Sequence, residues 1–194
     1  MQSSPDNMNH VVLVTEQNIV IGTLPKLAAH NKNTPLHRAF SIFLFNQSGE
    51  LLLQQRSSKK KTWPDTWSNS CCGHPQLNEE LLDAAKRHLK HELGIQEPTL
   101  TTILPDYRYR FEKDGIVENE ICPVMVAFTE EKPKPDPNEV KAIKWIQWKK
   151  WLDEITKKPD FYSPWCVEET RLLNKSPKFK SFLKLTLRMS SRTK

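Results

Sequence analysis

The segment from Glu79 to Leu93 constrains the fold most, because its hydrophobic period differs from that of the chain on either side. Apolar side chains recur in it at the spacing of one helical stripe: Leu82, Ala85, Leu89 and Leu93. Asn78 is the predicted N-cap, and Gly94 follows the expected last turn. We therefore predict one amphipathic helix over residues 79–93.

Short runs rich in aliphatic, β-branched or aromatic residues surround this helix. They predict strands at His10–Thr15, Ala39–Phe45, Leu51–Gln55, Tyr107–Phe111, Ile121–Phe128 and Ala142–Trp148. The N-Q-S-G run at 46–49 predicts a hairpin turn, and the charged, proline-rich run at 130–139 predicts a surface loop. Strands interrupted by a helix indicate an α/β (α+β) fold.

The chain has 194 residues, which is within the range of a single domain, and we predict one domain over residues 1–194. Its net charge of +6 comes from the last 28 residues, where eight Lys or Arg stand against two Glu. Apolar residues in that segment, including Leu172, Phe179 and Phe182, recur at helical intervals interrupted near Pro177. We favour a packed basic helix there, and a polyanion-binding tail is the alternative.

The sequence contains neither an apolar run that predicts a membrane span nor a signal-peptide pattern. No apolar run reaches the roughly 18 to 20 residues that cross a bilayer, and residues 1–9 are polar, without a signal-peptide core. The four cysteines include an adjacent pair, Cys71 and Cys72, whose geometry disfavours an ordinary disulfide. We therefore expect free thiols, a reducing compartment and a cytoplasmic protein with no membrane span.

A possible metal site is suggested by histidines and glutamates in or beside non-helical segments. Glu118 and Glu120 are two apart at the entrance to a predicted strand, so their side chains share a face and repel unless a cation lies between them. Imidazole and carboxylate ligands suit Mn²⁺, Fe²⁺ or Zn²⁺, and Mg²⁺ less well. His30, His37 and His74 are candidate ligands, although spacing alone favours a loop or surface residue for each of them taken singly.

The segment Gly73–Ile95 is more specific. It reads G-x5-E-x7-R and then carries Leu89, Glu92, Gly94 and Ile95, which resembles the Nudix box. In such a box a loop, a helix and a loop aim carboxylates at a divalent cation that holds a diphosphate. His88 and His91 stand where the hydrolases carry glutamates. This argues against a Nudix pyrophosphohydrolase of nucleoside or isoprenoid diphosphates, which remains the alternative function.

Six runs in order narrow the resemblance. They are L-x-K-x-A-A-H ending at His30, L-H-R-A-F from Leu36, W-P-D-T-W-S-N-S-C-C-G-H-P from Trp63, P-D-Y-R-Y-R from Pro105, G-I-V-E-N-E-I-C-P from Gly115, and F-Y-S-P-W ending at Trp165. Together they resemble the type I isopentenyl diphosphate isomerase family. The resemblance implies a Nudix fold, with a mixed β-sheet flanked by helices, a core at about 36–166, an N-terminal strand extension and a C-terminal helical extension at 167–194.

The resemblance implies two divalent cations. One ion, Mn²⁺, Zn²⁺ or Mg²⁺, is expected at the matching positions His30, His37, His74, Glu118 and Glu120. The second, Mg²⁺, is expected against the substrate diphosphate, held by Glu92 and the main chain near Cys72. Lys26, Arg56 and Lys60 match the diphosphate contacts. Family members carry arginine at the position of His88, so neighbouring Arg87 is the candidate for that contact.

The implied reaction converts isopentenyl diphosphate to dimethylallyl diphosphate in isoprenoid biosynthesis, by adding one proton and removing another. Cys72 and Glu120 match the two acid/base residues. We expect Glu120, assisted by Tyr109, to protonate the alkene and Cys72 to act at C2. The indole of Trp165 would stabilise the cation between the two steps. Cys71 has no matching role. The expected partner is the small-molecule substrate, and no nucleic-acid partner is expected. The protein is expected to be a monomer or a homodimer.

Overall fold

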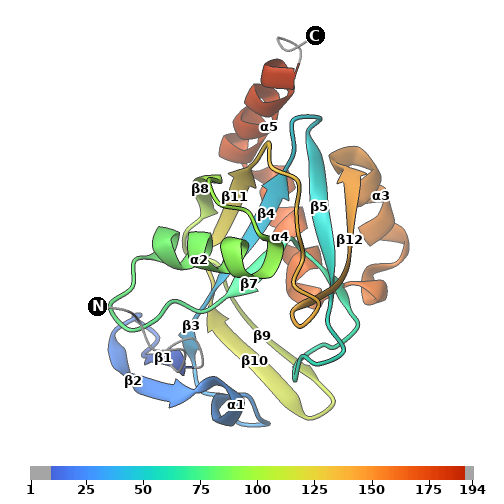
Figure 1. Cartoon of the computed structure of the whole chain (residues 1–194). Helices are drawn as coiled ribbons and strands as arrows, with labels where there is room; N and C mark the ends of the chain where they lie inside the picture. Colours follow the sequence, from blue (N-terminus) through green and yellow to red (C-terminus); the bar gives the residue numbers. More distant parts are fainter. Residues whose placement is uncertain (1–9, 191–194) are drawn as a thin grey trace.

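The computed structural model describes residues 10–190, so the polar residues 1–9 and the last four lie outside it. Two β-sheets form its frame (Figure 1). The first sheet has the order β2 (Val20–Pro25), β1 (His10–Val14), β3 (His37–Arg38), β10 (Ile116–Ile121) and β9 (Arg108–Lys113). The second has the order β12 (Val140–Gln147), β5 (Glu50–Arg56), β4 (Phe40–Phe45), β11 (Val124–Phe128) and β8 (Thr99–Leu104). Short strands β6 (Trp67–Ser68) and β7 (Cys71–Gly73) pair with β5 and β4.

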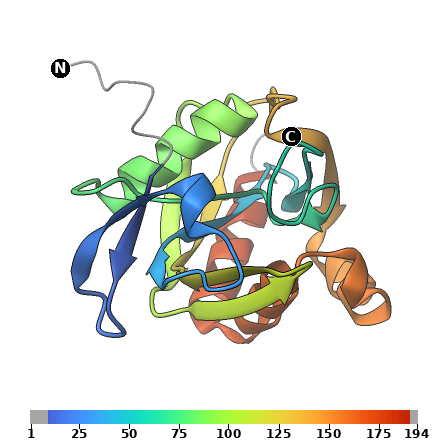
Figure 2. The ribbon, with the colours of Figure 1, turned by 90° about the horizontal axis from the view of Figure 1, so that it is seen from below.

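Helices cover both faces of the second sheet (Figures 1 and 2). They are α2 (Leu81–Leu93) on one face and α3 (Trp148–Lys157), α4 (Pro164–Lys175) and α5 (Pro177–Ser190) on the other. A 3₁₀ turn (Pro159–Phe161) lies between α3 and α4, and the short α1 (Lys26–Ala29) follows β2 beside the first sheet. Along β4 the side chains alternate: Ile42 and Leu44 pack in the cluster under α2, whereas Phe43 and Phe45 pack in the cluster with α3, α4 and α5. The strand is therefore buried on both faces, as the predicted class of a mixed sheet flanked by helices requires.

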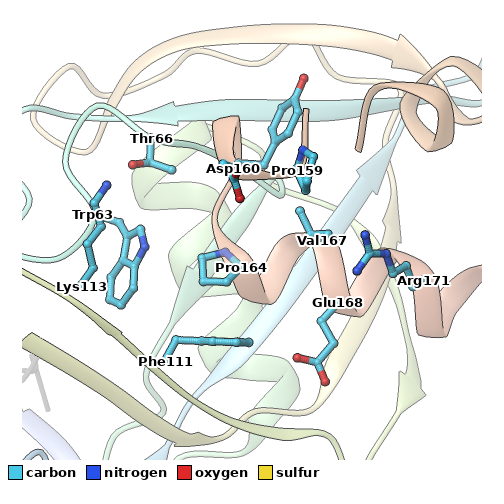
Figure 3. A pocket seen from close by; sticks show the side chains of 11 residues that line it. Trp63, Thr66, Phe111, Lys113, Pro159, Asp160, Pro164, Val167, Glu168 and Arg171 are labelled. Carbon is cyan, nitrogen blue, oxygen red and sulfur yellow. The ribbon is translucent and has the colours of Figure 1, made fainter. Parts of the chain in front are cut away.

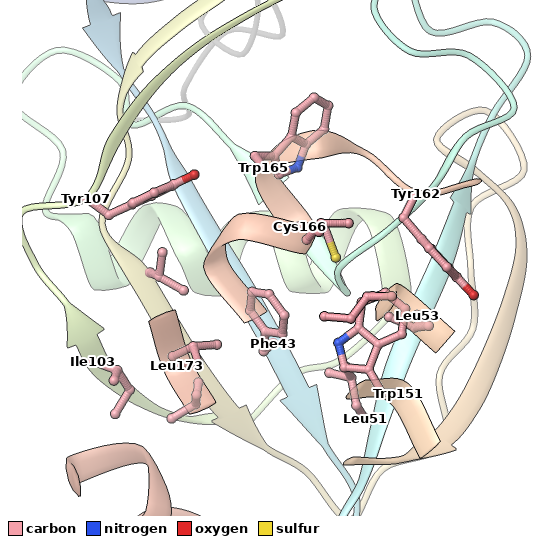
Figure 4. Close-up of a cluster of buried hydrophobic side chains, with 14 of the residues drawn as sticks. Phe43, Leu51, Leu53, Ile103, Tyr107, Trp151, Tyr162, Trp165, Cys166 and Leu173 are labelled. Atoms are coloured by element: carbon pink, nitrogen blue, oxygen red, sulfur yellow. The ribbon is translucent and has the colours of Figure 1, made fainter. Parts of the chain in front are cut away.

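The apolar side of the basic C-terminal segment is part of the larger core cluster (Figure 4). Leu173 and Phe179 are fully buried, and the Phe179 ring lies 5.8 Å from that of Phe45. The segment is divided at Ser176, where α4 ends and α5 begins with Pro177. This arrangement agrees with the packed, interrupted helix predicted for the segment.

The predicted strand over Ile121–Phe128 is confirmed from Val124 onward, but its start is wrong, because the chain changes sheets after Ile121. Strand β10 ends at Ile121 in the first sheet, and β11 begins at Val124 in the second. Between them the Cys122 N–H donates to the Tyr107 carbonyl, while Pro123 has no N–H to continue a ladder. Glu118 and Glu120 therefore lie inside a strand, not at its entrance.

The start of α2 also differs from the prediction. Asn78 has a φ of +62°, which is left-handed, and the helix begins at Leu81 with Glu80 as its N-cap. Its predicted end is confirmed: Gly94 has a φ of +68°, and its N–H closes the last turn on the Lys90 carbonyl. Strand β12 ends one residue before Trp148, which instead opens α3.

The four cysteines are free, as expected. None of the helices within residues 10–190 is long and apolar enough to cross a bilayer.

Candidate active site

Strand pairing in the first sheet brings distant residues together. The parallel register of β3 and β10 sets Glu120 beside His37, and the antiparallel register of β10 and β9 sets it beside Tyr109. In the second sheet, β7 pairs with β4 so that Cys72 lies opposite Ser41. The site thus forms where the chain passes from one sheet to the other.

Three imidazole rings converge here, with centroids of His30, His37 and His74 between 5.0 and 5.6 Å apart. Nδ1–H of His30 donates to the Lys26 carbonyl at 2.8 Å, and Nδ1–H of His37 donates to the Pro35 carbonyl at 2.9 Å. Because a carbonyl only accepts, these bonds place the proton on Nδ1 and leave the Nε2 lone pair available.

The carboxylates face those nitrogens. His30 Nε2 lies 2.9 Å from Glu118 Oε2, and Glu120 Oε1 lies 3.1 Å from His74 Nε2 and 3.4 Å from His37 Nε2. Glu118 Oε2 and His37 Nε2 are nevertheless buried without a hydrogen-bond partner. One atom each from His30, His37, His74 and Glu120 lie within 4.8 Å of one another. Buried imidazole and carboxylate atoms that converge, two of them left without a hydrogen-bond partner, fit a divalent cation.

The charge states of His74 and Glu120 suit metal binding. Burial lowers the pKa of His74 well below its usual range, which leaves a neutral imidazole at neutral pH. Burial opposes ionisation of Glu120, but the facing imidazoles of His37 and His74 hold its pKa well below the usual range. A neutral imidazole and an ionised carboxylate are the forms that coordinate metals.

Cys72 and Glu120 line the same small cavity. Its other walls are Lys26, Arg56, Lys60, Thr62, Gly73, His74, Tyr109, Glu118 and Trp165. The cavity volume of about 30 Å³ admits no more than about one water molecule, so the site is closed. Burial raises the pKa of Cys72 to about 12, and the side chain is therefore a thiol at neutral pH.

Trp165 and Tyr109 form an aromatic wall beside the carboxylate. The indole of Trp165 is 2% exposed and stacks on the Tyr109 ring, with centroids 5.8 Å apart and an interplanar angle of 17°. The Tyr109 hydroxyl donates a 2.6 Å hydrogen bond to Glu120 Oε2. The aromatic faces and the acid/base candidate therefore belong to one packed unit.

Asn69 connects the thiol with the indole, a role that sequence reasoning missed. Its amide Nδ2–H lies 3.1 Å from Cys72 Sγ, and its Oδ1 accepts from Trp165 Nε1–H at 3.2 Å. Asn69 is fully buried. The available signal was its place in the W-S-N-S-C-C-G-H-P run, but a buried asparagine there predicts no particular partner.

Cationic side chains occupy another part of the cavity wall. The Arg56 guanidinium donates to the Thr62 carbonyl at 2.9 Å and lies 5.7 Å from the Trp165 ring centroid. Lys60 forms an ion pair with Glu139. Burial lowers the pKa of Lys60 to about 8, despite the opposing charge of Glu92. With Lys26, these residues gather three of the predicted diphosphate contacts.

Arg87 is not among the residues that line the cavity. Its guanidinium makes two hydrogen bonds to Glu79, of 2.7 and 2.6 Å, and a third of 3.2 Å to the His74 carbonyl. Arg87 thus braces the loop before α2, and the structure does not bring it to the other basic residues. Glu92 is likewise outside the cavity wall and contacts His88.

A larger hollow of about 500 Å³ lies on the other side of Trp63 (Figure 3). Its walls carry both Lys113 and Arg171 and both Asp160 and Glu168, so no single charge dominates it. Trp63 lines this hollow, and its ring packs edge-on against that of Trp165, which lines the closed cavity, with centroids 5.1 Å apart. The converging histidines, carboxylates and thiol lie on the small-cavity side, where we place the chemistry.

Comparison with known proteins agrees with this geometry. Residues 35–166 match the NUDIX domain. The chain is 44% identical over 163 residues to an isopentenyl-diphosphate Delta-isomerase of Saccharopolyspora erythraea, covering 84% of each chain. It is 43% identical over 173 residues to one of Salmonella typhi, covering 85% of this chain and 96% of that protein.

Solved structures resemble the fold at lower identity. A protein of Deinococcus radiodurans superposes with a TM-score of 0.60 at 21% identity, over 76% of this chain and 89% of the other. The MutT protein of Methanosarcina mazei gives a TM-score of 0.54 at 22% identity, over 73% and 97%. The fold is thus the Nudix fold with added C-terminal helices. On the sequence matches over most of its length, the chain belongs to the isopentenyl-diphosphate Delta-isomerase family of NUDIX-domain proteins.

Proposed function

We propose that this chain converts isopentenyl diphosphate to dimethylallyl diphosphate. The observation that carries the proposal is the closed cavity that Cys72 and Glu120 share with the indole of Trp165. A 1,3-allylic shift needs two proton-transfer groups around one hydrocarbon and a surface that tolerates a carbocation. The relatives named isopentenyl-diphosphate Delta-isomerase support this substrate.

The residues present fit divalent cations at two places. The first is the cluster of His30, His37, His74, Glu118 and Glu120, for which Mn²⁺, Zn²⁺ or Mg²⁺ is proposed. The second is Glu92, proposed to hold a divalent ion against the substrate diphosphate; Mg²⁺ is the ion that the sequence resemblance implies there. Such ions supply positive charge, to the carboxylates at the first place and to the diphosphate at the second.

Lys26, Arg56 and Lys60 are proposed to bind the diphosphate. All three line the cavity wall, and a diphosphate carries enough negative charge to engage several cations. Arg56 is anchored by the carbonyls of Thr62 and Trp63, which fixes its guanidinium before a ligand arrives. A preorganised contact loses less conformational freedom on binding.

The hydrocarbon end is proposed to lie between Trp165 and the proton-transfer groups. A desolvated indole face stabilises a cation by roughly 2 kcal/mol or more, and a closed pocket keeps water from trapping it. A cavity of about 30 Å³ is too small for a five-carbon chain, so substrate binding requires the walls to move apart.

Glu120 is proposed to deliver the proton to the terminal alkene carbon, with the Tyr109 hydroxyl orienting its carboxyl. Cys72 is proposed to take the proton from C2. Its sulfur carries a proton at rest, because burial raises the pKa to about 12, so that proton must leave before Cys72 acts as a base. Glu120, ionised at rest, is a group in the same cavity able to receive it.

Product analysis tests the proposal. Purified protein is incubated with isopentenyl diphosphate and Mg²⁺, and the mixture is followed by ¹H and ³¹P NMR. Dimethylallyl diphosphate is the expected product. Released phosphate or pyrophosphate without a rearranged alkene would instead support the Nudix hydrolase alternative.

The four free thiols fit a reducing compartment such as the cytoplasm.

A further inference from the structure

A second cluster of ligand-type atoms lies outside the cavity. One atom each from Cys71, His88 and Glu92 lie within 4.8 Å of one another. His88 and Glu92 are one turn apart on α2, and Cys71 is on β7, against which that helix packs. Cys71 and Glu92 are buried, and the His88 side chain is 12% exposed.

The imidazole of His88 is held in a narrow slot. A Cβ on Gly73 would come within 2.6 Å of three atoms of the ring, so only glycine leaves room for it. The Phe40 ring meets the imidazole edge-on at 5.3 Å on another side. His88 Nδ1 then lies 3.2 Å from Glu92 Oε1. Packing, more than this one contact, fixes the nitrogen beside the carboxylate.

The Glu92 carboxylate is buried beside the His88 imidazole and the Cys71 thiol. Among the described residues, no lysine or arginine comes within ion-pair distance of its carboxylate, and His88 is its one ion-pair partner. Its carboxylate thus lies buried with one imidazole and one thiol within 4.8 Å, and a cation can satisfy all three donor atoms at once.

The donor set indicates the kind of ion. Mg²⁺ takes oxygen ligands and keeps much of its water, whereas imidazole and thiolate suit Zn²⁺, Co²⁺ and Fe²⁺. We propose that Cys71, His88 and Glu92 bind a transition-metal ion, of the class of Zn²⁺ or Co²⁺, before substrate arrives. On binding, a metal–sulfur bond forms and the Cys71 thiol proton passes to solvent.

This inference deepens the proposed function and rests on it in one respect, that Glu92 is the ligand of the second ion. The bound ion is then a transition metal in place of the Mg²⁺ that the resemblance implies, and Cys71 has a role that the sequence did not indicate. Three protein ligands leave a fourth position open. A diphosphate oxygen bound by Lys60, which lines the neighbouring cavity, can fill it.

Cobalt titration of metal-free protein tests the site without using activity. The proposal expects two equivalents of Co²⁺ per chain, one of them with the near-ultraviolet absorption of a thiolate–cobalt bond. Cys71→Ser should abolish that absorption. His88→Gln and Glu92→Gln should weaken the second equivalent by more than about 100-fold. A large excess of Mg²⁺ should not displace it.

Two control variants make the titration specific. His91→Gln changes an exposed histidine on the same helix, and Cys72→Ser changes the adjacent thiol; both should keep the second equivalent and its absorption. Circular dichroism checks that each variant folds, and His88→Gln decides if Cys71→Ser does not. The proposal is overturned by one equivalent only, by two equivalents without thiolate absorption, by loss of the absorption in Cys72→Ser, or by displacement with Mg²⁺. The product assay on wild-type protein judges the isomerase proposal separately.

Discussion

Tyr109 and Glu120 face each other across the pairing of β9 with β10, and the tyrosine hydroxyl donates a 2.6 Å hydrogen bond to the carboxylate. The bond is partly buried, and it joins the proposed proton donor to the ring that stacks on Trp165. One side chain thereby orients the carboxyl group and supports the surface proposed to face the carbocation.

Tyr109→Phe should lower kcat by about 10-fold to 100-fold, because a hydrogen bond to a charged group contributes about 1.5–3 kcal/mol. Tyr107→Phe is the matched control. Its hydroxyl is buried without a hydrogen-bond partner, so its removal should leave kcat nearly unchanged. Steady-state kinetics of both variants make the comparison, and equal losses would remove the special role of Tyr109.

Asn69→Leu should lower kcat by about 10-fold to 100-fold while changing KM by less than about threefold. The substitution removes the bonds to the Cys72 thiol and the Trp165 indole but leaves the diphosphate contacts in place. Kinetics are measured at a temperature where circular dichroism shows a folded variant. A raised KM with unchanged kcat would mean that Asn69 supports binding and does not position the thiol.

The pH dependence of kcat/KM should show the lysine at the diphosphate end. Burial lowers the pKa of Lys60 to about 8, so the free enzyme loses this positive charge as the pH rises through that value. Above it, kcat/KM should fall about tenfold per pH unit. Lys60→Arg keeps its charge, and its profile should stay flat through the same range. An identical decline in both proteins would assign the ionisation to another group.

Phe179→Ala should lower the free energy of unfolding by about 3–5 kcal/mol, because the ring is fully buried against Phe45 and Trp148. Leu185→Ala, on the same helix but 60% exposed, should change it by about 0.5 kcal/mol or less. Denaturant unfolding measures both. Similar small effects would show that α5 contributes little to the core.

Local pattern was enough for part of this fold. The apolar stripe of α2 and the left-handed cap at Gly94 are properties of neighbouring residues, and both were predicted. The break after Ile121 was not, because it depends on which sheet each half of the run joins. The left-handed conformation of Asn78 was missed for a similar reason. Its neighbour Glu79 lies before the helix and accepts a hydrogen bond from Arg87, eight residues further on.

The site was predictable to the extent that residue type reveals chemistry. Histidines and glutamates named as metal ligands do converge, because the pairing of β3 with β10 brings their segments together. Asn69 was missed because a buried amide can serve many partners, and its contacts appear only once α4 is packed. Arg87 was placed with the diphosphate by its neighbourhood in sequence, whereas its guanidinium points to Glu79.

The most direct measurement is the position of deuterium after reaction in D₂O, followed by NMR. Wild-type protein should place solvent deuterium in a methyl group of dimethylallyl diphosphate. Cys72→Ala should form product at least about 10²-fold more slowly, yet it should still exchange deuterium into the terminal methylene of recovered substrate. Glu120→Gln should neither form product nor exchange deuterium into the substrate. Unlabelled product from the wild type, or undiminished turnover by Cys72→Ala, would contradict the assignment of a thiol and a carboxyl to the two ends of the double-bond shift.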